Sequence, residues 1–309
     1  MPNPMRGALL LASRNRAVRS LIENAPVSRS VVRRFVAGNA VDDAVRVAGE
    51  LVGTGLAVSL DHLGEDTTEV GHADATTKAY VTLLRRLAEA ELTPAAEVSV
   101  KLSAVGQALD ESMALDHARA ICEAAVGANT TVTLDMEDHT TTDSTLETLR
   151  ELRRDFPSVG AVLQAYLRRT HSDCRDLAVE GSRVRLCKGA YREPESVAYQ
   201  DRMDVDKSYI RCLRVLMKGP GYPMVATHDP RLVEIAGTMV KRSGRAKGTY
   251  EYQMLYGIRP NEQQRLASEG ETVRVYVPYG DEWYGYLMRR LAERPANVTF
   301  FLRSLATKG

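Results

Sequence analysis

Ionisable and polar side chains follow several short apolar segments of this 309-residue chain, where they could act on a small ligand. They are Lys101 in EVSVKLSA, Asp135, Glu137, Asp138 and His139 in TLDMEDH, Gln164 in VLQAYLRRT, Arg185 and Lys188 in RVRLCKGAY, Thr227 and His228 in MVATHD, and Glu251 and Gln253 in YEYQMLYG. Carboxylates, amides and cations of these types bind charged or polar ligands and transfer protons. Their repeated position after apolar segments predicts one shared site.

Lys101 interrupts an apolar segment, so its charge must be compensated if the segment is buried. A buried ammonium requires a carboxylate neighbour or a bound anion. Asp135, at the same level one strand along, is the predicted partner. The alternative is that Lys101 and Asp135 form an internal pair without a ligand role, or that Asp135 lies at a solvated strand end.

Arg289 and Arg290 are adjacent in a segment of helical pattern and so point about 100° apart. Such a pair is often a solvated surface feature. Here aromatic residues, Trp283 and Tyr286 among them, precede the arginines, and Glu293 lies four residues after Arg289. Glu293 could therefore hold Arg289 and leave Arg290 to bind a planar anion such as a carboxylate.

The stretch CKGAY suggests a phosphate or cofactor contact, because Gly189 and Ala190 permit close approach to the backbone and Lys188 supplies charge. Metal binding by His228 has little support, since no HxH or HExxH partner motif is present. We therefore expect no metal. The sequence also contains no GxSxG motif for a nucleophilic serine.

Eight segments rich in β-branched residues alternate with segments of helical period. The predicted strands are 56–60, 97–102, 131–136, 161–166, 183–188, 224–227, 249–255 and 273–277. The predicted helices between them include 76–92, 111–126, 145–156 and 231–242, each long enough to connect parallel strands. This count predicts an α/β fold of the (βα)8 barrel type, whose active sites lie where the strands end. A doubly wound open sheet is the alternative, although no GxGxxG motif follows the first strand.

The segment before the first predicted strand has the pattern of three short helices, the third at 41–52. Pro26 separates the first two. We therefore expect an N-terminal helical segment, 1–54, packed on a catalytic barrel with a C-terminal tail, 55–309.

Composition argues against a nucleic-acid partner and a membrane span, and it indicates the cellular compartment. Lysine plus arginine total 41 and aspartate plus glutamate total 40, which predicts no nucleic-acid partner. The four cysteines form no CxxC pair, so a reducing cytoplasm is expected. No stretch approaches the 18 apolar residues of a membrane span. Peripheral membrane attachment remains open.

Eight motifs together resemble those of the proline dehydrogenase family, in its monofunctional bacterial form, over roughly residues 50–300. They are VSVKLSA, TLDMEDH, LQAYLRRT, RLCKGAY, ATHD, YEYQMLYGI, VYVPYG and YLMRRLAERPAN. The resemblance implies a (βα)8 barrel with non-covalent FAD at the strand ends. It further implies oxidation of L-proline to Δ1-pyrroline-5-carboxylate by hydride transfer to the flavin, the first step of proline degradation.

The resemblance also implies a role for each matching residue. Lys101, Arg289 and Arg290 would bind the proline carboxylate, with Glu293 and Asp135 orienting these cations. Tyr276 would pack on the pyrrolidine ring, Tyr286 would shape the pocket, and Arg185 would lie by the flavin N5. The predicted FAD contacts are Met136, Gln164, Lys188, Gly189, Ala190, Thr227 and His228. The sequence departs from the family at Cys187 and Arg192, which puts local flavin contacts in doubt.

The family implies that a membrane quinone accepts the electrons, with transient contact at the inner membrane surface. A separate pyrroline-5-carboxylate dehydrogenase is the implied pathway partner. Phe300 and Phe301 in the tail are expected to pack on the barrel, with membrane contact as the alternative. Two rival functions remain: a class I aldolase with Lys101 as Schiff-base nucleophile, and a non-catalytic barrel that binds an amino acid or a partner protein.

The predicted carboxylate clamp is testable by substitution of either arginine. Arg289→Met or Arg290→Met should raise the KM for proline steeply and leave the flavin content unchanged. Loss of one partner of a buried charge pair costs about 2 to 5 kcal/mol. Steady-state kinetics with flavin quantification measures both effects, and near-normal affinity in either variant would place that arginine on the surface.

Overall fold

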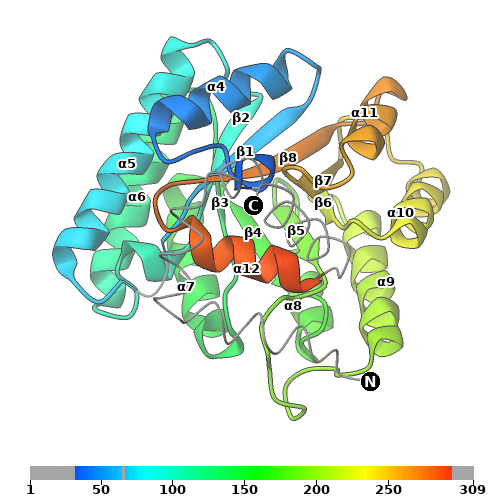
Figure 1. The fold of residues 1–309 in the computed structure, drawn as a ribbon. Helices are drawn as coiled ribbons and strands as arrows, with labels where there is room; N and C mark the ends of the chain where they lie inside the picture. The colour runs from blue at the N-terminus through cyan, green and yellow to red at the C-terminus, as the bar shows by residue number, and fades with distance from the viewer. Residues whose placement is uncertain (1–31, 65–66, 294–309) are drawn as a thin grey trace, which may run out of the picture.

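Eight parallel strands form a closed barrel in the order β1 to β8 (Figure 1). The computed structural model describes residues 32–64 and 67–293, with side chains up to residue 288. The strands are β1 Ala57–His62, β2 Ala96–Val100, β3 Val132–Leu134, β4 Gly160–Gln164, β5 Arg183–Cys187, β6 Tyr222–Ala226, β7 Glu251–Leu255 and β8 Val273–Tyr279. Each overlaps a predicted strand, so the barrel is confirmed and the open sheet is wrong.

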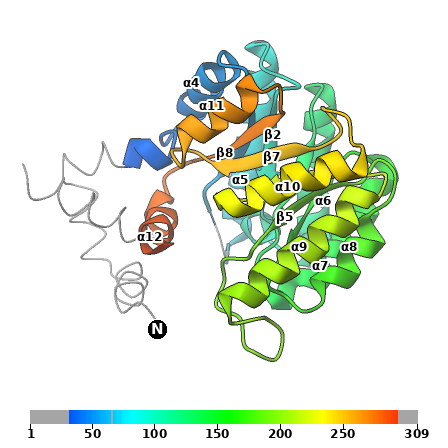
Figure 2. The ribbon, with the colours of Figure 1, turned by 90° about the vertical axis from the view of Figure 1, so that its right-hand side faces the viewer.

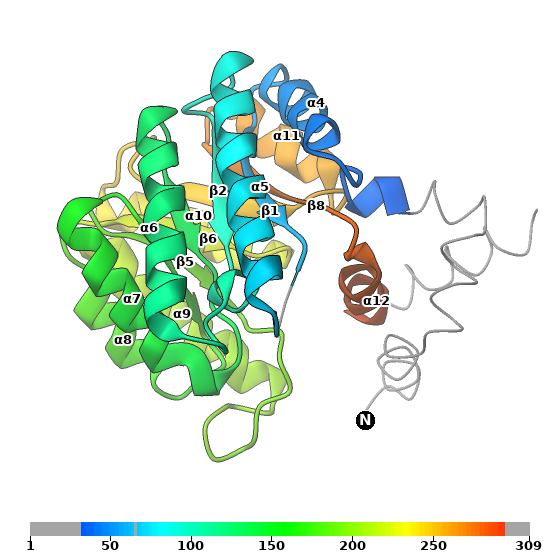
Figure 3. The same cartoon turned by 90° about the vertical axis from the view of Figure 1, so that its left-hand side faces the viewer.

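Helices surround the barrel, and the last of them along the chain lies across its end (Figure 1). They are α4 Val41–Val52, α5 Val70–Glu89, α6 Glu111–Gly127, α7 Thr142–Asp155, α8 Thr170–Leu177, α9 Arg202–Lys218, α10 Pro230–Ser243, α11 Pro260–Ser268 and α12 Trp283–Glu293, with short 3-10 helices at Leu102–Val105 and His139–Thr141. Helices α8, α9 and α10 run side by side in Figure 2, and α5, α6 and α7 do so in Figure 3. The apolar core lies between this layer and the strands, because outward residues such as Val58, Val98 and Val275 are fully buried there.

Aspartates cap the start of three helices and fix where the loops above the strands turn. The Asp110 carboxylate accepts from the backbone of Ser112 and Met113 at α6, and Asp201 does the same at α9. Asp229 caps α10, whose first residue is Pro230. A side-chain oxygen at this position satisfies backbone N–H groups that the helix leaves without partners.

Helix α4 coincides with the predicted helix 41–52 and packs against β1, β8 and α5. Residues 32–35 are also helical, and Phe35 packs with Trp283, Tyr284 and Leu287 of α12 in a second apolar cluster. The first predicted helix and the tail with Phe300 and Phe301 lie outside the described residues. The division of the chain at residue 54 therefore stays a prediction.

Charged residues fill the amino-terminal half of the barrel interior. We call Glu97, Arg183, Glu251 and Arg274 the lower cluster. Arg183 Nη2 lies 2.6 Å from Glu97 Oε2, and Arg274 Nε lies 2.8 Å from Glu251 Oε1. Burial alone would raise the pKa of Glu97, but the guanidinium groups of Arg183 and Arg274 bring it below its ordinary value. The lower cluster thus holds two carboxylates against two cations.

Within the described part of the chain, no helix is both long enough and apolar enough to cross a membrane.

Arg274→Met should destabilise the protein strongly, because the buried Glu251 would lose its guanidinium partner. Breaking a buried pair in this way costs about 3 to 5 kcal/mol. The matched control is Arg265→Met, since Arg265 pairs with Glu262 and Glu269 at the surface and exposed pairs contribute about 1 kcal/mol or less. Urea unfolding measures the free energy of unfolding of the two variants. An equal decrease in both would contradict a larger stabilising contribution from the lower cluster.

Candidate active site

A cavity of about 500 Å³ opens among the carboxyl ends of the strands. Thirteen of the predicted site residues line it: Lys101, Asp135, Met136, Gln164, Arg185, Lys188, Gly189, Ala190, Thr227, His228, Gln253, Tyr276 and Tyr286. Four others expected at the same site do not line it: Glu137, Asp138, His139 and Glu251. Tyr286 belongs to α12, which lies across the end of the barrel in Figure 1. The structure thus brings together residues that span 186 positions of the sequence.

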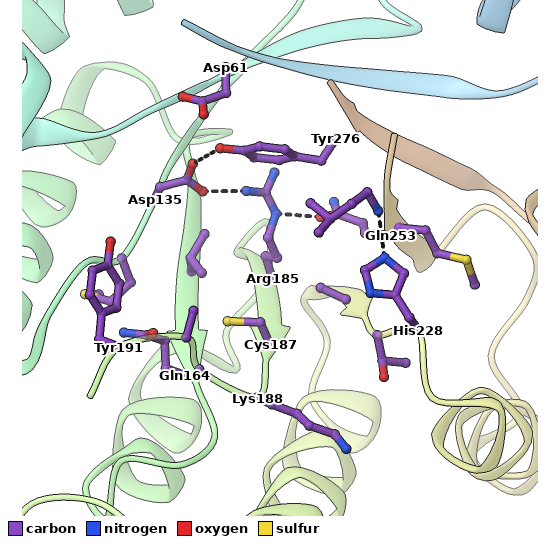
Figure 4. Close-up of a pocket in the computed structure, with 18 of the residues that line it drawn as sticks. Asp61, Asp135, Gln164, Arg185, Cys187, Lys188, Tyr191, His228, Gln253 and Tyr276 are labelled. Atoms are coloured by element: carbon purple, nitrogen blue, oxygen red, sulfur yellow. Dashed lines mark hydrogen bonds and ion pairs between the residues drawn. The ribbon is translucent and has the colours of Figure 1, made fainter. Parts of the chain in front are cut away.

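Arg185 lies in the centre of this constellation and is almost fully buried (Figure 4). Its Nε donates to the Gln253 side-chain oxygen, its Nη1 lies 2.6 Å from Asp135 Oδ1 and 2.9 Å from Ser99 Oγ, and its Nη2 lies 3.3 Å from Ser59 Oγ. Strands β1, β2, β7 and the residue that follows β3 therefore hold one guanidinium. Such a cation is fixed in direction, because each of its nitrogens is bound.

Asp135 joins Arg185 to Tyr276. The Tyr276 hydroxyl donates to Asp135 Oδ2 over 2.7 Å, while its ring lies 5.3 Å from the Arg185 guanidinium carbon. Burial, reinforced by the Asp135 charge, holds the pKa of Tyr276 well above its ordinary value. The phenol is therefore a neutral hydrogen-bond donor, and its ring presents a fixed surface to the cavity.

Lys101 does not pair with Asp135, so that prediction is wrong. The Lys101 ammonium lies 2.7 Å from both carboxylate oxygens of Asp61, on the other neighbouring strand. Register alone does not explain this choice, because Asp61 of β1 is opposite Ser99, two residues before Lys101, whereas the β2–β3 register pairs Val100 with Leu134 and continues to Lys101 beside Asp135. Asp135 is instead drawn to Arg185. An ammonium in such a pair is poorly suited to be a Schiff-base nucleophile, which disfavours the aldolase alternative.

Tyr80 of α5 holds the end of β1 from outside the barrel. Its hydroxyl accepts from the His62 backbone at 3.0 Å, donates to the Ser99 carbonyl at 2.8 Å and lies 3.4 Å from Asp61 Oδ1. Asp61 is almost completely buried, and this burial raises its pKa although the Lys101 ammonium opposes the shift. Asp61 is therefore a carboxylate that a change of partner can readily protonate.

The segment after β5 forms one wall of the cavity. Gly189 has a φ of +113°, and a Cβ there would overlap the ring of Tyr166. Lys188 turns outward to Asp206 at 2.5 Å and Asp229 at 3.2 Å. Hydrogen bonding to Arg231, supported by Lys188, holds the pKa of Asp229 well below its ordinary value. This wall thus exposes backbone beside a fixed cation, as an anionic cofactor group requires.

Amide and imidazole groups complete the opposite walls. Gln164 Nε2 donates to the Glu137 carbonyl over 2.6 Å, which fixes the rotation of its amide. His228 Nε2 accepts from the Leu255 backbone N–H over 2.8 Å, so the neutral imidazole carries its proton on Nδ1. A ring nitrogen occupied in this way is not available as a metal ligand. Thr227 Oγ1 accepts from the Asp229 backbone at 3.1 Å and shapes the same loop.

The two departures from the family pattern differ in position. Cys187 lines the cavity, and burial raises the pKa of its thiol to about 11, so it is a neutral side chain there. Arg192 is exposed on the loop after β5. Cys187 is therefore the one of the two that borders the cavity.

Sequence reasoning missed Asp61, because the first strand was expected to end at Leu60. The SLDH sequence at the end of β1, in which polar Asp61 directly follows apolar Leu60, is the signal that could have found it. Tyr191, Arg202 and Asp229 also line the cavity and were not predicted. Arg289, Arg290 and Glu293 lie in α12, but their side chains are outside the described residues and their roles stay predictions.

Comparisons with known proteins agree on one family. A family model described as proline dehydrogenase matches residues 44–303 of this chain. Proline dehydrogenase 1 of Bacillus subtilis (strain 168) is 36% identical over 304 residues, which cover 98% of this chain and 100% of that protein. Proline dehydrogenase of Deinococcus radiodurans is 40% identical over 281 residues, which cover 89% and 90% of the two chains.

Solved structures show the same fold. Proline utilization A (PutA) from Bdellovibrio bacteriovorus, inactivated by N-propargylglycine, matches with a TM-score of 0.81 and 24% identity. The match covers 93% of this chain and 36% of that longer chain, so it bears on the barrel alone. On the family model and the two bacterial relatives, the chain belongs to the proline dehydrogenase family.

Proposed function

We propose that this protein is an FAD-dependent L-proline dehydrogenase, an oxidoreductase that acts on a CH–NH donor and forms Δ1-pyrroline-5-carboxylate. The observation that carries the proposal is the cavity itself. All of the predicted substrate and cofactor residues whose side chains are described line it together. The membership of the chain in the proline dehydrogenase family supplies the reaction.

The cavity walls fit non-covalent FAD. A flavin offers ring nitrogens and carbonyls that need fixed donors and acceptors, and a pyrophosphate that needs cations and backbone N–H groups. Arg185, Gln164 and His228 supply oriented polar groups, while Lys188 and the backbone at Gly189 supply the second set. Met136, Ala190 and Thr227 complete the proposed contacts. When bound, the flavin supplies the acceptor for the hydride.

The residues of this chain orient the substrate. Lys101, Arg289 and Arg290 bind the carboxylate, with Glu293 orienting the arginines. Tyr276 packs on the ring and Tyr286 closes the pocket. Such a clamp uses binding energy remote from the reacting carbon to fix its position. Arg185, held by Asp135, would supply a buried positive charge that stabilises the reduced form of a bound flavin.

The proposed reaction needs an electron acceptor and an enzyme that consumes its product. We infer that electrons pass to a membrane quinone during transient contact with the membrane surface. The product imine opens with water to an aldehyde, and a separate pyrroline-5-carboxylate dehydrogenase is the class of enzyme that oxidises it. These partners rest on the family and on the chemistry of the product.

FAD, and not FMN, should be released when the purified protein is denatured. The reason is the spread of proposed contacts over several strand ends, from Gln164 to His228, which suits an extended dinucleotide better than a mononucleotide. Chromatography of the released flavin against both standards measures this. Finding FMN would refute the assignment.

Lys101→Met should weaken proline binding roughly tenfold to a hundredfold, which matches about 1.5 to 3 kcal/mol for a hydrogen bond to a charged group. Pyrrolidine, which lacks the carboxylate, should be a poor substrate for the wild type and the variant alike. Anaerobic stopped-flow reduction of the flavin by each compound measures both effects.

The opposite outcomes are equally clear. Loss of all turnover in Lys101→Met, whatever the charge of the ligand, would indicate a nucleophilic lysine. Reduction of the wild type by pyrrolidine as fast as by proline would exclude the carboxylate clamp.

A further inference from the structure

The Lys101–Asp61 pair faces the cavity and joins one ammonium to one carboxylate. Asp61 is 1% exposed and Lys101 is 8% exposed, and both residues line the cavity. Lys101 approaches both Asp61 oxygens at 2.7 Å with a single ammonium on a flexible stem. A ligand carboxylate that reaches this ammonium competes with Asp61 for it.

The proposed substrate carries both charges that such an exchange requires. Proline enters as a zwitterion, with a carboxylate and a secondary ammonium, and such ammonium groups ionise near pH 10 (about the value of a lysine). Hydride can leave the ring carbon only if the neighbouring nitrogen has a free electron pair. A proton must therefore leave the ammonium inside the cavity, and this step, which rests on the proposed function, needs an acceptor.

Three carboxylates line the cavity among the described residues, and Asp229 is bound by Lys188 and Arg231. Of the other two, Asp135 is the poorer acceptor. Its oxygens are bound by the Arg185 guanidinium at 2.6 Å and the Tyr276 hydroxyl at 2.7 Å. Arg185 is in turn held by Gln253 and Ser99, so a substrate carboxylate cannot draw it away. Asp61 differs, because its cation is the one that the substrate carboxylate binds.

Among the described side chains around Asp61, Asp61 itself is the group that can gain or lose a proton. The titratable side chains that face it are Lys101 from β2, Asp135 from beyond β3, Tyr276 and Tyr279 from β8, Tyr80 from α5 and its neighbour His62. Burial raises the pKa of each of these tyrosines and lowers that of His62, so all four are neutral near pH 7. Burial and the Asp135 charge raise the pKa of Asp61, and Lys101 opposes them. When the Lys101 ammonium leaves Asp61 for another carboxylate, Asp61 therefore becomes a stronger base.

We propose that substrate binding exchanges the partner of Lys101: the substrate carboxylate takes the ammonium of Lys101, and Asp61 accepts a proton from the substrate ammonium. One N–H bond breaks, one O–H bond forms on Asp61, and the nitrogen keeps the electron pair. Asp61, Asp135, Lys101 and Arg185 hold two negative and two positive charges before the exchange. With the substrate included, the net charge is unchanged afterwards, so no uncompensated charge is buried.

The proton returns to solvent when the product leaves. Loss of hydride from the neutral amine gives a protonated imine, which departs with its carboxylate as a zwitterion. Lys101 then regains Asp61, whose proton is released. The cycle thus releases the one proton that accompanies oxidation of the zwitterion.

Asp61→Asn tests the exchange through the pH dependence of kcat/KM for proline. In the wild type, kcat/KM should rise as Asp61 ionises and then stay level, because the zwitterion is the productive form. In Asp61→Asn only the rare neutral amine is productive, so kcat/KM should rise about tenfold per pH unit up to about pH 10. The matched control, Asp135→Asn, should be slower but keep the level region. A level region in Asp61→Asn, or its loss only in Asp135→Asn, would overturn the proposal.

A second measurement needs no variant. Tetrahydrofuran-2-carboxylate has the ring and the carboxylate but no ammonium, so Asp61 must take its proton from solvent when this analogue binds. Calorimetry of the wild-type holoenzyme in buffers of different ionisation enthalpy should count about one proton taken up, and Kd should rise about tenfold per pH unit above the Asp61 ionisation. Binding without proton uptake would overturn the proposal, even if Asp61→Asn does not fold.

The two levels of inference fail differently. A wild-type protein without flavin, or with flavin that proline does not reduce, would contradict the proposed function. A wild type that proline reduces, but that binds the analogue without taking up a proton, would contradict the partner exchange alone.

Discussion

A buried guanidinium, Arg185, is the constraint on which the rest of the site depends. A charge inside a barrel is tolerated only when its nitrogens are bound and a carboxylate compensates it. Gln253, Ser99, Ser59 and Asp135 meet that requirement from four directions. The barrel interior is consequently polar at these levels, where barrels of this class usually hold bulky aliphatic side chains.

The same requirement extends both ways along the barrel axis. Below Arg185, the Gln253 amide donates to Glu251 and so connects the site to the lower cluster. Above it, Asp135 binds Tyr276, and Asp61 binds Lys101. Each cluster balances its own charges, so a zwitterionic substrate can enter without leaving an unpaired charge. The proposed arginines of α12 would add further donors to the substrate carboxylate.

The sequence predicted the fold well, because strand and helix periodicities are local. The strands β5 and β7 end within one residue of their expected ends, and α4 matches its expected bounds. Pairing between side chains is not local. Lys101 has a strand with an aspartate on either side of it, and it pairs with Asp61 because Asp135 is held by Arg185 of β5 and Tyr276 of β8, which are distant in the sequence. The role of Tyr80, which reaches Asp61 from an outer helix, had no sequence signal.

The most direct test of this account is the midpoint potential of the bound flavin in Arg185→Met. Loss of the fixed cation should destabilise the reduced flavin and lower the potential by about 30 mV or more, equivalent to about 1.4 kcal/mol for two electrons. Arg202→Met, which removes an exposed cation from the same cavity, should change it much less because solvent screens that charge. An unchanged potential in Arg185→Met would contradict the central role given to this guanidinium.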